Sequence, residues 1–252
     1  ALALLMWCVR GRSVRQGAVL GLVFGAAFMF VHIWWMRAVA DPAWVGLAGI
    51  EAVFIGLAGA GMAVASRTRW WPVAMPVVWL AVEVFRGGWP FSGFMWGRLS
   101  FAVVDTPFAA PLPWIGSNGV SLLVALTAAG LLWLYDDPRH RLRAAAAGLA
   151  GLVAVLAVPA WAGPQWTTDR TAVIGLVQGD VPGDGTEVVQ HHRQITRRHV
   201  ELTVAMGAAA DAGTAPRPDF VVWPENSTAV DPFRDQPTRD GILEAVRGLG
   251  AP

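Results

Sequence analysis

The sequence has no lysine, since all 19 of its basic residues are arginine. It has one cysteine, and only 15% of its residues are charged. The single cysteine excludes an internal disulfide, and the missing lysine excludes catalysis by a lysine of these 252 residues. Soluble domains contain about 25% charged residues, so the low charge points away from that class. The arginine bias, with frequent alanine and glycine, indicates a GC-rich coding sequence rather than contacts with nucleic acid.

Apolar residues make up 55% of the chain and gather in long runs. A helix needs about 20 apolar residues to cross a bilayer core of about 30 Å. Residues 1–9 are typical of the end of a spanning helix, and longer runs follow at about 17–36, 42–65, 70–85, 119–135 and 144–161, of which 70–85 is short. We therefore predict a polytopic α-helical membrane bundle over residues 1–163, with five complete spans and one partial span.

Arginine residues gather in alternate loops between these runs. The first, third and fifth loops carry Arg10, Arg12, Arg15, Arg67, Arg69, Arg139, Arg141 and Arg143. Cytoplasmic loops of membrane proteins are enriched in arginine and lysine, so these loops are expected in the cytoplasm. The same alternation predicts that the residues after about 163 lie outside the cytoplasm.

Residues 164–252 have a different composition, with 8 arginines and 12 acidic residues. Short apolar runs at 171–177 and 220–223 are typical of buried strands. An amphipathic helix is expected at about 186–210 and another helix at about 238–249. Strand, helix, strand and helix in succession predict the beginning of an α/β layer, about one third of a complete domain.

Glu225 is the candidate catalytic residue, because it follows the second predicted strand in the turn "WPEN". Loops that follow rigid strands often carry reactive groups. A carboxylate works as a general base near neutral pH when burial or neighbouring groups tune its pKa, and the position after "VVW" suggests partial burial. The alternative is a surface acid that caps the next segment.

No metal site and no cofactor are predicted. His191 and His192 are adjacent, so they point in different directions on a helix and differ from the i, i+4 pair of a metal site. With Arg193, Arg197 and Arg198 they are expected to form a solvated basic face. No phosphate-binding glycine loop is present.

Four ionisable residues lie in or beside the apolar runs. Glu83 precedes Arg86 by one helical turn, which predicts an ion pair between them. Glu51 has no visible partner and is expected to be a neutral carboxyl group inside the bundle, and His32 is expected at the membrane interface. The long loop at 86–119 is rich in tryptophan, proline and glycine, which suits either an aromatic anchor or a site of lipid access.

Three segments carry a resemblance to a known family. They are "GLVQGDVP" at 175–182, "WPEN" at 223–226 and "EVFRGGWPFSGFMWGRLSF" at 83–101. The first two resemble the opening of a nitrilase-type carbon-nitrogen hydrolase domain, an αββα sandwich. On a helical membrane bundle, that domain is similar to the apolipoprotein N-acyltransferase family of the bacterial plasma (inner) membrane.

The resemblance implies a reaction and its partners. In this family a cysteine thiolate takes an acyl chain from a phospholipid donor as a thioester and passes it to the diacylglyceryl-cysteine of a lipoprotein acceptor. Glu225 matches the family's general base, whose partners are a lysine that stabilises the oxyanion and the cysteine nucleophile. The sequence identifies neither an oligomeric state nor a nucleic-acid partner.

The sequence departs from this pattern because it has no lysine, and Cys8 is expected at the cytoplasmic end of a helix. We expect the lysine and cysteine beyond Pro252, in a longer protein of which this chain lacks both ends. The chain by itself is then expected to be inactive. Two other interpretations stay open: a membrane-tethered nitrilase-like amidase, and a non-catalytic polytopic scaffold or transporter.

Overall fold

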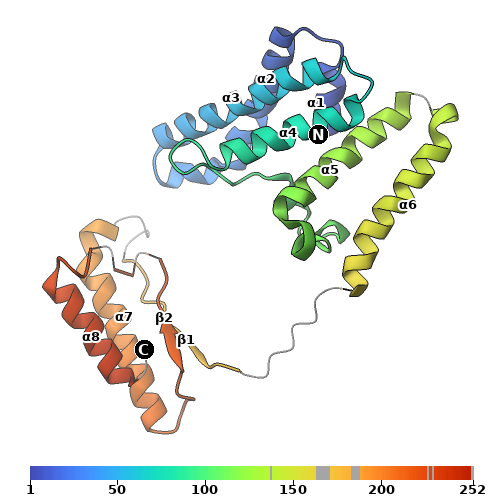
Figure 1. The fold of residues 1–252 in the computed structure, drawn as a ribbon. Coiled ribbons are helices and arrows are strands. Elements are labelled where there is room, and N and C mark those ends of the chain that lie inside the picture. Colours follow the sequence, from blue (N-terminus) through green and yellow to red (C-terminus); the bar gives the residue numbers. More distant parts are fainter. Residues whose placement is uncertain (137, 163–170, 183–187, 226, 229, 251–252) are drawn as a thin grey trace. The chain divides into compact units, whose positions relative to one another are not determined.

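The computed structural model describes residues 1–136, 138–162, 171–182, 188–225, 227–228 and 230–250. The chain divides into two compact units, Ala1–Gln165 and Trp166–Pro252. The first unit is helical, and the second combines two helices with a small sheet (Figure 1).

The described residues of the first unit form six α-helices, with 3₁₀ segments between α2 and α3 and between α4 and α5. They are α1 (Leu2–Val9), α2 (Val14–His32), α3 (Asp41–Ala65), α4 (Trp71–Arg86), α5 (Leu112–Asp136) and α6 (Pro138–Ala162), with η1 (Trp34–Ala38), η2 (Leu99–Val103) and η3 (Pro107–Ala109). In the described part of the chain, α2, α3, α5 and α6 are long and apolar enough to cross a membrane. The predicted helical membrane part is confirmed, but α4 has only 16 residues, so four helices rather than five reach membrane-crossing length.

Helix α2 begins at Val14, three residues before the apolar run suggested. The Ser13 side chain accepts a hydrogen bond from the Gln16 backbone N–H, and the Gln16 side chain accepts one from the Ser13 N–H. This reciprocal capping box satisfies two backbone donors that a helix start leaves free. The polar cap therefore extends the helix beyond its apolar part.

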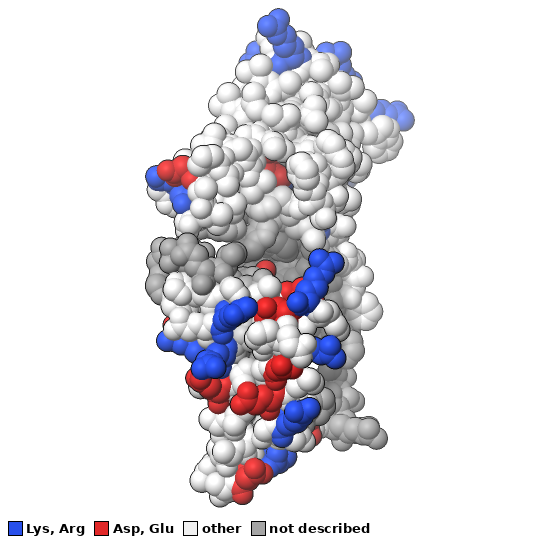
Figure 2. All heavy atoms as spheres, turned by 90° about the vertical axis from the view of Figure 1, so that its left-hand side faces the viewer, with Lys and Arg blue, Asp and Glu red and all other residues white. Residues whose placement is uncertain are grey.

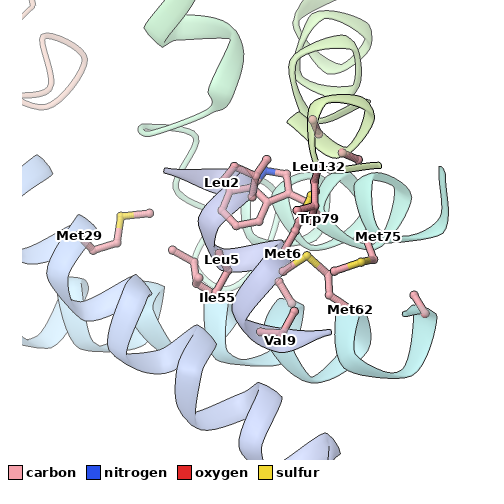
Figure 3. Close-up of a cluster of buried hydrophobic side chains, with 14 of the residues drawn as sticks. Leu2, Leu5, Met6, Val9, Met29, Ile55, Met62, Met75, Trp79 and Leu132 are labelled. Carbon is pink, nitrogen blue, oxygen red and sulfur yellow. The ribbon is translucent and has the colours of Figure 1, made fainter. Parts of the chain in front are cut away.

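The core of the first unit lies around α1. Figure 3 shows Leu2, Leu5, Met6 and Val9 beside Met62, Met75, Trp79 and Leu132. These side chains come from α1, α3, α4 and α5, and each is at most 7% exposed. Flexible methionine side chains fill irregular gaps between helices, which suits a helix of only 8 residues packed among longer ones.

Helices α2 and α3 pack through small residues. Gly17, Gly21 and Gly25 occur at every fourth position of α2 and face small residues of α3, which runs the opposite way. A Cβ atom at Gly21 would lie 2.5 Å from the Ile55 carbonyl oxygen and 3.0 Å from the Gly59 Cα. Small residues of this spacing let membrane helices approach closely, where van der Waals packing holds them together.

Substituting Gly21→Ala is expected to destabilise the helical unit by about 1–3 kcal/mol, because the added methyl group overpacks a backbone contact. Gly49→Ala is the matched control, since no heavy atom lies within 4 Å of a Cβ at Gly49 in α3. Denaturant unfolding in detergent measures both variants. Equal stability of the two variants would contradict a close backbone contact at Gly21.

Contacts at one end of the unit bring the arginine-rich loops together. Arg10 forms an ion pair with Asp136 at 2.8 Å, which joins the end of α1 to the end of α5. The Gly11 backbone N–H donates to the Ser66 hydroxyl at 3.3 Å, which joins the same loop to the end of α3. Three of the connections that carry arginine therefore meet at this end.

The second unit is a parallel βαβ arrangement followed by a helix. Strand β1 (Ile174–Leu176) pairs with β2 (Phe220–Val222), with Gly175 opposite Val221. Helix α7 (Val188–Asp211) connects the strands, and α8 (Gln236–Leu249) packs against α7. Asp235 caps α8, and hydrogen bonds from Thr238 hold the pKa of its carboxyl group below the usual value.

The two faces of this sheet differ. Gly175 is buried, and a Cβ atom there would lie 2.7 Å from the Met206 sulfur, so α7 covers this face directly. The opposite face is apolar and exposed and consists of Ile174, Leu176, Phe220 and Val222. Exposed apolar sheet faces mark surfaces that pack against another layer.

The surface charge differs between the units as the sequence predicts. Figure 2 shows mostly uncharged atoms over the helical unit, with basic groups gathered at one end. The unit with α7 and α8 carries both signs intermixed (Figure 2). A helical surface with so few charges on this face is suited to contact with lipid.

Candidate active site

Glu225 lies in the turn that follows β2. The Ser227 backbone N–H donates to the Pro224 carbonyl at 3.3 Å, which closes the turn. The Glu225 side chain is exposed, so the partial burial suggested by its sequence position is not found. The turn lies beyond the end of β2.

Buried polar side chains of α7 hold the turn on both sides. Thr203 accepts a hydrogen bond at 2.9 Å from the Trp223 indole N–H, two residues before Glu225. Thr196 donates at 2.9 Å to the carbonyl of Ser227, two residues after Glu225. His199 lies between them on the same helix face and is 2% exposed.

These α7 residues were not predicted from the sequence, which singled out His191, His192 and the arginines beside them. Thr196, His199 and Thr203 are spaced i, i+3 and i+7, which places them on one face of a helix. That spacing is the available signal, because the same face carries the buried Ile195 and Val200 beside them. His191 and His192 themselves are partly buried.

Metal ligands do not cluster in the described part of the chain. No group of three or more histidine, cysteine, aspartate or glutamate side chains is placed there to hold an ion. Cys8 lies in α1 of the helical unit as a free, partly buried thiol. His32 is exposed at the end of α2 and stacks on Phe28 with the ring centroids 5.2 Å apart.

The helical unit contains a buried ion pair between Arg86 and Glu51. The Arg86 Nη1 atom lies 2.8 Å from the Glu51 Oε2 atom, and their side chains are 4% and 2% exposed. This corrects two predictions, since Glu51 has a charged partner and Arg86 does not pair with Glu83. The sequence spacing of Glu83 and Arg86 identified neighbours on one helix, whereas the actual partner comes from α3.

Glu83 instead binds the segment that follows α4. Its Oε2 atom accepts hydrogen bonds from the Trp79 indole at 3.3 Å and from the Leu99 backbone N–H at 3.1 Å. Arg86 also donates to the carbonyls of Phe94 and Trp96 at 3.2 and 3.1 Å. The two charged side chains at the end of α4 therefore fasten the backbone of residues 94–99, which leads into η2.

The same segment is tied to α5. Arg98 donates to the Ser117 hydroxyl at 3.1 Å and to the Asn118 side chain at 2.9 Å. The loop between α4 and η2 exposes Trp89, Phe91, Met95 and Trp96. The centroids of the Trp96 and Trp35 rings are 5.3 Å apart. The loop is thus anchored at its base and presents aromatic side chains outward.

Comparison with known proteins identifies the family of this helical arrangement. Residues 1–130 match the family model described as the apolipoprotein N-acyltransferase N-terminal domain. The chain belongs to the apolipoprotein N-acyltransferase family. The resemblance to this family is therefore confirmed. The matched residues include the Glu51–Arg86 pair and the loop held by Glu83.

Relatives of this family align with both units. The chain is 33% identical over 271 aligned residues to the apolipoprotein N-acyltransferase of Mycolicibacterium smegmatis, an alignment that covers 100% of the chain and 46% of the relative. It is 28% identical to that of Methylococcus capsulatus, over 94% of the chain and 47% of the relative. The protein of Vibrio cholerae is 22% identical, over 88% and 44%. The chain spans about half the length of the curated relatives it matches.

Proposed function

We propose that this chain is part of a multi-pass membrane enzyme that N-acylates bacterial lipoproteins. The enzyme takes an acyl chain from a phospholipid and transfers it to the amine of an N-terminal diacylglyceryl-cysteine. The observation that carries this proposal is the alignment of both units, including the Glu225 turn, with relatives named apolipoprotein N-acyltransferase. The long apolar helices suit a reaction in which both substrates are lipids.

Glu225 acts in this proposal as the general base. Its carboxylate takes the proton of a cysteine thiol as the sulfur attacks the phospholipid ester, and it returns that proton to the lysophospholipid oxygen that leaves when the thioester forms. It then takes the proton of the acceptor amine as that amine attacks the thioester, and the cysteine sulfur leaves and regains the proton when the amide forms. The position of Glu225 on a turn after a parallel strand supports this role. A lysine and a cysteine from outside this chain complete the site, so the chain alone is inactive.

The exposed sheet face supports a nitrilase-like sandwich. Ile174, Leu176, Phe220 and Val222 would pack against a second layer supplied by further residues of the protein. Such a layer would also surround Glu225 and reduce its contact with water. The burial needed to tune a carboxylate for proton transfer then comes from the completed domain.

Acyl transfer by the full-length protein tests the proposal. A phospholipid labelled in its acyl chain and a diacylglyceryl lipopeptide with a free amine are supplied together. We expect the label in an amide of the lipopeptide, whereas this chain alone transfers none. An amidase would release ammonia from a soluble amide and leave the lipopeptide unmodified, and a scaffold or transporter would do neither.

We propose that the protein lies in the plasma membrane with the arginine-rich end of its helical unit facing the cytoplasm. The Arg10–Asp136 contact supports it, because it brings two of the basic connections to one end. Single cysteines at Arg139 and Glu225, in a protein with Cys8→Ser, are expected to react with impermeant reagents from opposite sides. Labelling of both from the same side would contradict the orientation.

A further inference from the structure

We propose that Thr196, His199 and Thr203 of α7 act together to position the catalytic turn, with His199 as a neutral hydrogen-bond acceptor. The inference rests on the proposed role of Glu225. The three side chains are 4%, 2% and 3% exposed. None of them is hydrogen-bonded to the Glu225 side chain, so they are positioning residues.

The partners of His199 define its protonation state. Its Nε2 atom lies 3.0 Å from the Gly179 backbone nitrogen, and its Nδ1 atom lies 2.8 Å from the Ile195 carbonyl oxygen. A backbone N–H can only donate and a carbonyl can only accept, so Nε2 accepts and Nδ1 carries the proton. Only the neutral ring with a proton on Nδ1 satisfies both contacts.

The ring also fixes the loop after β1. A Cβ atom at Gly179 would lie 2.5 Å from Nδ1 and 2.7 Å from Cε1 of His199, so the imidazole lies directly against the Gly179 backbone. Gly179 follows β1 closely, and Trp223 follows β2. Because the strands are parallel, these positions lie at the same edge of the sheet.

His199 and Thr203 hold Trp223 together. The His199 and Trp223 ring centroids are 5.4 Å apart. The Trp223 indole donates to the Thr203 hydroxyl at 2.9 Å, and that hydroxyl donates to the His199 carbonyl at 2.7 Å. The side-chain polar atoms of His199, Thr203 and Trp223 all have a partner. Such satisfied networks define one arrangement of the groups that they join.

The Thr196 contact fastens the other side of the turn. With Trp223 held on one side and Ser227 on the other, the short segment between them has both flanking residues bound to one rigid helix. The Glu225 carboxylate is then presented at a fixed place although its own side chain is exposed. Proton transfer depends on such placement, and a shift of about 1 Å can lower a rate by about 100-fold.

Variants of His199 test the proposal in the full-length protein. In His199→Gln the side-chain oxygen can reach the place of Nε2 and accept from the Gly179 N–H, whereas His199→Phe keeps a ring beside Trp223 but has no acceptor. We expect His199→Phe to lower kcat for acyl transfer by about 10- to 100-fold with KM unchanged. His199→Gln is expected to keep most of the activity.

A second measurement does not depend on activity. Amide hydrogen exchange followed by mass spectrometry is expected to speed up at Gly179 and in the turn after β2 in His199→Phe, but not in His199→Gln. If the wild-type protein shows no acyl transfer, the proposed function fails, while the exchange data still decide whether His199 orders these two segments.

Thr203→Val and Thr203→Ser extend the test if His199→Phe does not fold. The serine variant keeps the hydroxyl that accepts a hydrogen bond from Trp223, so its kcat is expected to stay near that of the wild type. The valine variant has no such hydroxyl, and its kcat is expected to fall. Thr214→Val is the matched control, because its hydroxyl bonds to the Ala209 carbonyl at an exposed site. The proposal would be overturned if His199→Gln and His199→Phe, or Thr203→Ser and Thr203→Val, had the same kcat and the same rates of amide hydrogen exchange.

Discussion

Glu225→Gln is expected to lower the kcat/KM of acyl transfer by the full-length protein by about 10²- to 10⁴-fold, the usual contribution of general acid–base catalysis. Glutamine has nearly the same shape and can still form hydrogen bonds, but it cannot take a proton from a thiol or an amine. Initial rates with a labelled phospholipid and a lipopeptide acceptor measure the effect. The loss should appear mainly in kcat, since the side chain is proposed to move protons rather than to bind lipid.

Glu244→Gln provides the comparison for this experiment. Glu244 is an exposed acid of α8 in the same unit, so its substitution changes the charge by the same amount without touching the turn. We expect the activity of Glu244→Gln to equal that of the wild type. If Glu225→Gln is as active as Glu244→Gln, Glu225 is a surface turn acid, which is the other interpretation that its sequence position allows.

Arg86→Met is expected to destabilise the helical unit by about 3–5 kcal/mol, because it leaves one member of a buried ion pair without its partner. Glu51 would remain 2% exposed with no cation beside it. The carbonyls of Phe94 and Trp96 would also lose the donor they share. Denaturant unfolding of the protein in detergent micelles, followed by circular dichroism, gives the free energy of unfolding.

Two further variants show whether burial is the cause. Arg37→Met breaks an exposed ion pair with Asp41, whose side chain is 65% exposed, and should cost about 1 kcal/mol or less. The double variant Glu51→Met/Arg86→Met removes both charges, so it should be more stable than Arg86→Met alone. A loss in Arg86→Met no larger than that in Arg37→Met would show that the buried pair contributes little to the fold.

Much of the helical unit could be predicted from the sequence because long apolar runs are a strong signal. The predicted run at 42–65 corresponds to α3, Asp41–Ala65. The partner of Arg86 could not be predicted, since Glu51 is 35 residues away and belongs to another helix. Spacing within one helix indicated Glu83, which binds the Leu99 backbone instead.

The order of strands and helices in the second unit was predicted from the sequence, but the length of its first strand was not. The apolar run at 171–177 suggested a longer strand than β1, which has only 3 residues, because pairing with β2 rather than composition limits a strand. The turn at Glu225 follows from the pattern of residues, whereas its exposure depends on which elements cover it. His199 was missed because a histidine in a polar helix has the same local pattern whether it is buried or solvated.

The shortness of α4 has a consequence for the surrounding lipid. At 1.5 Å per residue, its 16 residues extend about 24 Å, while the 25 residues of α3 extend about 38 Å. Val73, Val77 and Phe85 of α4 are exposed on its outer side. A bilayer that matched this shorter length would be thinner beside α4. Headgroups on that side would then lie closer to the membrane midplane than along α3.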